Sequence, residues 1–266
     1  MSRSSKRANH AGSRYATSEI ISTSLGGVIG TIKCDEEYYQ ERLITDFGKK
    51  VLSHKPKKET YQKQYDAIYT LVGKVCRGEK AKPKPGVKTR HPPSTTRQVL
   101  YDISKSLRID ALYAMLHLER DETISIIYNY FDGMIDVIYE EERWRKGGVI
   151  PYFHTLLELS RLGTDHPNFD PKVMYGEHAF SSAVQHGDVE FTKYLLENSF
   201  ASGDDLLEHI DSHSDYLFEC KGEDRRSEIK RNGVDEAMPG IKETFLYLLS
   251  KADPEHISHI DVNDYI

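Results

Sequence analysis

The sequence predicts a mostly α-helical protein in which helical hairpins stack in an array, preceded by a small basic helical unit. Apolar residues recur at helical spacing along most of the 266 residues. The clearest hairpin is segment 176–198, where two amphipathic helices are separated at His186-Gly187-Asp188. Such a hairpin cannot bury its apolar face alone, so it must pack against neighbouring hairpins.

The composition of residues 1–17 predicts a disordered basic tail, because Ser, Lys and Arg dominate and few large apolar residues are present. Residues 18–77 predict the small helical unit. Its helices are expected over residues 34–52, where Asp35-Glu36-Glu37 supplies an acidic first turn, and over residues 60–76.

Residues 78–93 predict a basic, Pro-rich linker, because four prolines and five Lys or Arg fall within sixteen positions. Ser94 or Thr95 then caps a helix whose apolar periodicity continues from Val99 to Leu118. Residues 121–139 predict a further helix, although their β-branched side chains leave a short strand possible.

The remainder of the larger domain, residues 94–266, predicts helices joined by loops. A helix opens near Pro151 and ends near Leu162, and a loop from Gly163 to Pro171 precedes the hairpin. The elements expected after the hairpin are an acidic helix over 204–220, a charged surface excursion over 221–240 and a last helix over 242–251.

Segment 176–198 resembles one ankyrin repeat. The resemblance is carried by Ala183, by Gly187-Asp188-Val189-Glu190 at the turn and by Lys193-Tyr194-Leu195-Leu196-Glu197 in the second helix. The opening, His178-Ala179-Phe180-Ser181, departs from the Thr-Pro-Leu-His of that family. A shift of 80 residues places Leu107 on Gly187. The array is therefore expected to be ankyrin-like or an irregular α-helical stack.

The resemblance implies a non-enzymatic protein-protein interaction module, an adaptor or modulator whose partner is another protein. In ankyrin-like stacks the partner meets the inter-repeat turns and the first helices. The positions that this implies as partner-binding residues are Tyr175, Glu177, Ser181, Gln185 and His186.

The charge distribution supports an alternative, an RNA- or DNA-binding protein. Residues 49–90 hold thirteen Lys or Arg and three acidic residues, whereas residues 91–266 hold seventeen basic and thirty-three acidic residues. Lysines that neutralise phosphates beside aromatic residues are typical of sequence-tolerant nucleic-acid binders. The candidate residues are Lys55, Lys57, Lys58, Lys80, Lys82, Lys84, Lys88 and Arg90. A solvated face with a basic linker explains the same pattern without any ligand.

No familiar catalytic or cofactor motif is present, so neither an enzyme nor a cofactor is expected. His209 and His213 share a helical face, but no Cys-x-x-Cys accompanies them, and no metal site is expected. Three widely separated cysteines fit reduced thiols. The chain has no long apolar run and no apolar leader, which predicts an intracellular protein, cytoplasmic or nuclear, that does not use a membrane.

Overall fold

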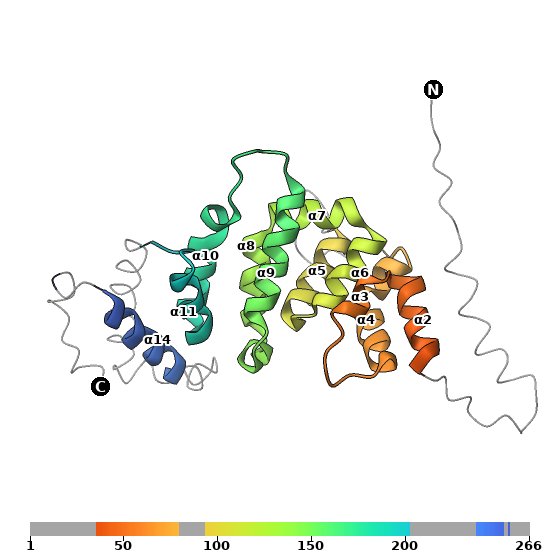
Figure 1. Ribbon diagram of the computed structural model, residues 1–266, viewed down its shortest axis with the longest axis horizontal. Helices are drawn as coiled ribbons and strands as arrows, with labels where there is room; N and C mark the ends of the chain where they lie inside the picture. Colours follow the sequence, from red (N-terminus) through yellow and green to blue (C-terminus); the bar gives the residue numbers. More distant parts are fainter. Residues whose placement is uncertain (1–35, 80–93, 203–237, 253–254, 256–266) are drawn as a thin grey trace, which may run out of the picture. The chain divides into compact units, whose positions relative to one another are not determined.

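The computed structural model describes residues 36–79, 94–202, 238–252 and 255. Within these ranges every regular element is an α-helix or a short 3-10 helix (Figure 1). The prediction of a mostly α-helical protein is therefore confirmed, and the strand considered within residues 121–139 is absent. The predicted tail over residues 1–17 and nearly all of the predicted linker lie outside the described residues.

Contacts divide the chain into two compact units. Unit 1 comprises the described residues of 1–103 and 108–123, and unit 2 those of 104–107 and 124–266. Helices α5 (Thr95–Ser106) and α7 (Arg120–Asn129) cross the division. The domain limits expected from the sequence stay a prediction.

Unit 1 packs α6 (Ile109–Leu118) against α2 (Glu36–Phe47), α3 (Lys50–Ser53) and α4 (Tyr61–Cys76). The periodicity of α4 places Ile68 and Val72 in the core, and Thr60 caps the helix by accepting a hydrogen bond from the Lys63 amide. Other side chains without exposed surface in this core are Leu43, Val51, Leu100, Ile103, Leu112 and Met115.

The single helix expected over residues 34–52 is wrong, because the chain leaves the helix at Gly48 and α3 begins at Lys50. Gly48 has a φ of +85°, and a Cβ there would lie 2.9 Å from the His117 side chain. The apolar spacing continues across the break, so periodicity alone does not reveal it.

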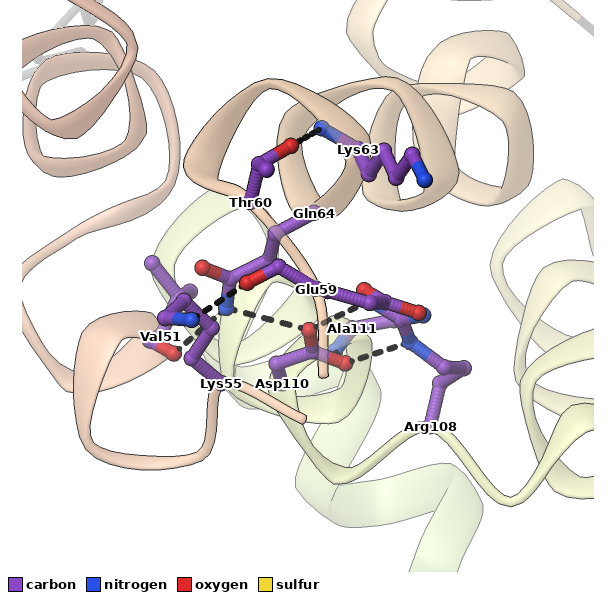
Figure 2. Close-up of polar contacts among 9 residues, drawn as sticks. All are labelled: Val51, Lys55, Glu59, Thr60, Lys63, Gln64, Arg108, Asp110 and Ala111. Carbon is purple, nitrogen blue, oxygen red and sulfur yellow. Dashed lines mark hydrogen bonds and ion pairs between the residues drawn. The ribbon is translucent and has the colours of Figure 1, made fainter. Parts of the chain in front are cut away.

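A buried polar cluster joins the loop after α3 to the start of α6 (Figure 2). Arg108 donates to both carboxylate oxygens of Asp110 at 2.9 and 2.7 Å and to Glu59 at 2.7 Å. The Gln64 amide donates to Asp110 at 3.1 Å and to the Val51 carbonyl at 2.9 Å. Because Asp110 and Gln64 have almost no exposed surface, each depends on these partners for its hydrogen bonds.

Unit 2 contains α8 (Phe131–Asp136), η1 (Val137–Glu140), η2 (Glu142–Lys146), α9 (Val149–Ser160), η3 (Arg161–Gly163), α10 (Pro171–His186), α11 (Val189–Glu197) and α14 (Met238–Lys251). Helix α10 contacts α8, α9, α11 and α14. The core is strongly aromatic, and its fully buried rings include Phe131, Tyr152, Phe153, Phe180, Phe191 and Phe245.

The continuous helix expected over 121–139 is also wrong, because α7 ends at Asn129, α8 starts at Phe131 and the final turn is 3-10. The last helix is present but begins at Met238, four residues before its expected start. The expected helix over 204–220 and nearly all of the expected excursion over 221–240 lie outside the described residues.

The hairpin predicted around Gly187 is confirmed as α10 and α11, although α10 begins earlier than expected, at Pro171 with Asp170 as its cap. Gly187 has a φ of +69°, and the Asp188 amide donates to the Ala183 carbonyl at 2.9 Å. Eighty residues earlier, Leu107 has a φ of +53° and the Arg108 amide donates to the Ile103 carbonyl at 3.4 Å. The helix expected to continue from Val99 to Leu118 is therefore wrong, because it is divided here into α5 and α6. The two turns share one backbone pattern, while ankyrin-like stacking stays a prediction.

Candidate functional site

A cleft of about 490 Å³ lies in unit 2, where inter-helix turns meet. Its walls come from the end of η2, the first turn of α9, the turn between α10 and α11, and the start of α14. The lining residues are Trp144, Arg145, 147–151, 186–191, Gly240 and Glu243. Segments separated by about a hundred residues of sequence thus build one concave surface.

Two glycines bring the start of α14 against the α10–α11 turn. A Cβ on Gly187 would lie 2.4 Å from the Ile241 nitrogen, and a Cβ on Gly240 would lie 2.6 Å from the Gly187 carbonyl oxygen. Only residues without a side chain allow the two backbones to approach this closely. This approach positions the wall of the cleft that α14 contributes.

His186 is held rigidly at the edge of the cleft. Its Nδ1–H donates to the Ser182 carbonyl at 2.8 Å, and its ring stacks on Tyr139 with centroids 4.4 Å apart. The hydrogen bond at Nδ1 leaves Nε2 as the nitrogen that accepts a hydrogen bond from a ligand when the ring is neutral.

Asp188 lies beneath this edge and performs a structural role. It is 8% exposed, its carboxylate accepts from the Phe191 amide at 3.1 Å as the cap of α11, and the Tyr139 hydroxyl donates to it at 3.3 Å. Burial raises the pKa of Asp188 above its ordinary value, although both hydrogen bonds act in the opposite direction. Burial also raises the pKa of the Tyr139 hydroxyl well above its ordinary value.

Substitution Asp188→Asn is expected to preserve or raise the stability of unit 2 at neutral pH, because the amide oxygen keeps the hydrogen bond from the Phe191 amide and the amide NH2 donates to the Tyr139 hydroxyl oxygen, without a buried charge. A folded-state pKa above the unfolded value means that the wild type gains stability as the pH falls through the folded pKa. The Asp188→Asn variant lacks this gain, whereas Asp188→Ala is expected to cost about 1 kcal/mol through loss of the cap. Urea unfolding at neutral and mildly acidic pH measures all three proteins, and an Asn variant as unstable as the Ala variant would contradict the assignment.

The cleft combines charged, polar and aromatic groups. Glu190 and Glu243 are exposed, and the Arg145 guanidinium lies 5.4 Å from the Trp144 ring centroid. No hydroxyl or thiol side chain belongs to this described lining. The lining therefore offers charged and aromatic side chains to a ligand.

Of the predicted partner-binding residues, Glu177, Ser181 and Gln185 lie four residues apart on one face of α10. His186 lines the cleft, and Gln185 beside it is exposed and donates to the Ser181 hydroxyl at 3.3 Å. Glu177 is exposed two turns earlier on α10. The sequence reasoning missed Trp144 and the α14 residues, because no local pattern links these segments to the hairpin turn.

Tyr175 belongs to the core of unit 2 rather than to its surface. It is 4% exposed, its ring stacks on Phe131 at 3.9 Å, and its hydroxyl donates to the Tyr128 carbonyl at 2.9 Å. A ring enclosed in this way has no surface to offer a partner, so Tyr175 is not part of the candidate site.

Of the candidate nucleic-acid residues, only Lys55, Lys57 and Lys58 lie within the described residues. Lys57 and Lys58 are exposed, whereas Lys55 is half-buried with its ammonium 5.2 Å from the Tyr61 ring centroid. The remaining candidates lie outside the described part of the chain: Lys80, Lys82, Lys84, Lys88 and Arg90.

His209 and His213, considered above as metal ligands, also lie outside the described residues. The described ranges contain no group of three or more His, Cys, Asp or Glu side chains able to hold a metal ion. Among the helices in those ranges, none has the length and apolarity needed to cross a membrane.

Comparison with known proteins assigns no family. No family model matches the chain, and neither a curated protein nor a solved structure shows significant similarity to it.

Proposed function

We propose that this protein is a non-enzymatic protein-protein interaction module that binds a protein partner at the cleft of unit 2. The observation that supports the proposal is the cleft itself, in which two inter-helix turns and the start of α14 place exposed charged side chains and the half-buried Trp144 ring around one hollow. Its volume of about 490 Å³ suits a few side chains of a partner.

The location agrees with the ankyrin-like resemblance, in which partners meet inter-repeat turns. The α10–α11 turn contributes His186 to the cleft edge, and Gln185 is exposed beside it. The ring of His186 is already ordered by Tyr139 and by the Ser182 carbonyl, so binding costs little additional side-chain entropy.

Site-specific photocrosslinking tests the proposal in cells of the source organism. A photoreactive residue at Gln185 or Glu190 is expected to form discrete protein adducts, whereas the same residue at Glu41 is expected to form none. Both Glu190 and Glu41 are exposed helical glutamates, and Glu41 belongs to unit 1.

Charge reversal provides the matched control for that experiment. Glu190→Arg is expected to weaken binding of the captured partner at least about tenfold, because the new cation projects from the cleft edge, whereas Glu41→Arg is expected to leave it unchanged. Adducts at Glu41 equal to those at Gln185, or equal affinity of the two variants, would show that the cleft is not the binding site.

A further inference from the structure

Unit 1 carries a second charged feature, independent of the cleft, which we call the lysine surface: Lys49, Lys50, Lys57, Lys58 and Lys63. All five side chains are exposed. Within the described residues, no ion pair involves any of them. A group of exposed ammonium groups without carboxylate partners attracts a polyanion.

The fold gathers these lysines into one compact segment. Residues 49–63 run through α3, the following loop and the first turn of α4, and the Gln64 amide closes the loop by donating to the Val51 carbonyl at 2.9 Å (Figure 2). Because this bond joins the residues that follow Lys50 and Lys63, the two ends of the segment lie side by side. Charges on α3, the following loop and the first turn of α4 are thereby brought together.

The single carboxylate in this segment does not neutralise the lysines. Glu59 is directed to Arg108, whose guanidinium contacts it at 2.7 Å (Figure 2). Burial alone would lower the pKa of Arg108, but its bonds to Asp110 and Glu59 raise that pKa overall, so the guanidinium stays charged. The cluster therefore directs the segment's own carboxylate to Arg108, while Glu36 of α2 accepts a hydrogen bond from the Tyr61 backbone amide at 2.7 Å.

Aromatic rings lie among the lysines. The Lys55 ammonium is 5.2 Å from the centroid of the half-buried Tyr61 ring, and the Lys50 ammonium is 5.4 Å from that of Tyr113. A ring beside cationic side chains is the combination that single-stranded nucleic acids use, with phosphates on the cations and a base on the ring. None of the large exposed apolar side chains of the described residues falls in this segment, which disfavours insertion into a membrane.

We propose that the lysine surface binds single-stranded nucleic acid through its phosphates, with Tyr61 as a stacking platform for a base. This binding site is separate from the cleft and does not depend on the protein-binding proposal. The strand is recognised by charge and stacking, so little dependence on base sequence is expected.

Titration of the full-length chain with fluorescent oligouridylate, oligothymidylate and a DNA duplex of similar length tests the proposal. Binding is expected to weaken steeply with salt, and the double variant K57Q/K58Q is expected to bind about tenfold more weakly, with the slope of log K against log salt reduced by roughly 1.4 for two lost phosphate contacts. The matched control K74Q/K146Q removes two exposed lysines elsewhere and is expected to retain both affinity and slope.

Tyr61→Leu separates stacking from charge. It is expected to weaken binding of the single strands by about fivefold or more and to leave the weaker duplex binding unchanged. Four results would overturn the proposal: no binding at low salt, wild-type affinity in K57Q/K58Q, duplex binding as tight as that of the single strands, or competition by polyglutamate as effective as that by unlabelled oligouridylate.

Discussion

Substitution Gly176→Ala is expected to unfold unit 2 or to reduce its stability by about 3 kcal/mol or more, through overpacking against backbone. Gly176 lies in the middle of α10, and a Cβ there would be 2.1 Å from the Phe200 carbonyl oxygen. Phe200 cannot retreat easily, because its amide donates to the Leu195 carbonyl at 2.9 Å and its ring packs edge-on against Phe153. The collision therefore separates α10 from the end of α11.

Gly73→Ala is the matched control, because Gly73 is also a helical glycine. The nearest atom to its added Cβ is the end of the Arg77 side chain at 2.9 Å, which can move. Alanine is there expected to leave stability unchanged or to raise it by up to about 1 kcal/mol through helix propensity. The fluorescence of Trp144, the single tryptophan, reports urea unfolding of unit 2, and circular dichroism follows the helices of both units, so that a circular-dichroism transition not matched in fluorescence reports unit 1. If Gly176→Ala changed the stability of unit 2 as little as Gly73→Ala changes that of unit 1, the close approach of Gly176 to the Phe200 carbonyl would be contradicted.

Substitution Arg108→Ala is expected to destabilise unit 1 by about 3–5 kcal/mol, because it leaves the buried Asp110 carboxylate without its cation. Asp110 is 1% exposed and receives two of its hydrogen bonds from Arg108. Asp110→Ala is expected to have a similar effect, because it removes the carboxylate to which both Arg108 and Gln64 donate hydrogen bonds. Denaturant unfolding followed by circular dichroism measures each loss.

The double variant R108A/D110A tests whether Arg108 and Asp110 stabilise unit 1 as a pair. Because the charges are removed together, its loss is expected to fall below the sum of the single losses by about 1–3 kcal/mol. Arg77→Ala provides the control, since the Arg77–Glu79 pair is exposed on both sides and is expected to contribute nothing measurable. Additive single effects would show that the cluster does not act as a buried ion pair.

Local sequence signals were sufficient to predict a mostly helical chain and to locate several helix ends. The spacing of Ile68 and Val72 predicted α4, Thr60 occupies its cap, and His186-Gly187-Asp188 predicted the turn between α10 and α11. These signals succeed because capping bonds and a left-handed turn residue act between near neighbours.

Local sequence patterns do not reveal contacts between residues that are far apart in the sequence. The break at Gly48 lies against His117, and the apolar pattern continues through it. Tyr175 was expected at a binding surface, but its place in the core depends on Phe131 and Tyr128. Periodicity identifies the face of a helix without identifying what covers that face.

In the candidate sites too, some features follow from the sequence alone and others depend on tertiary packing. The sequence by itself determined a largely helical chain, the hairpin turn and a concentration of lysines after residue 49. Only the tertiary structure decided that Glu59 faces Arg108 rather than those lysines, and that α14 closes a cleft beside the turn. The physical reason is range: helices and turns form from contacts a few residues apart, whereas charge pairing and concave surfaces depend on which distant segments pack together.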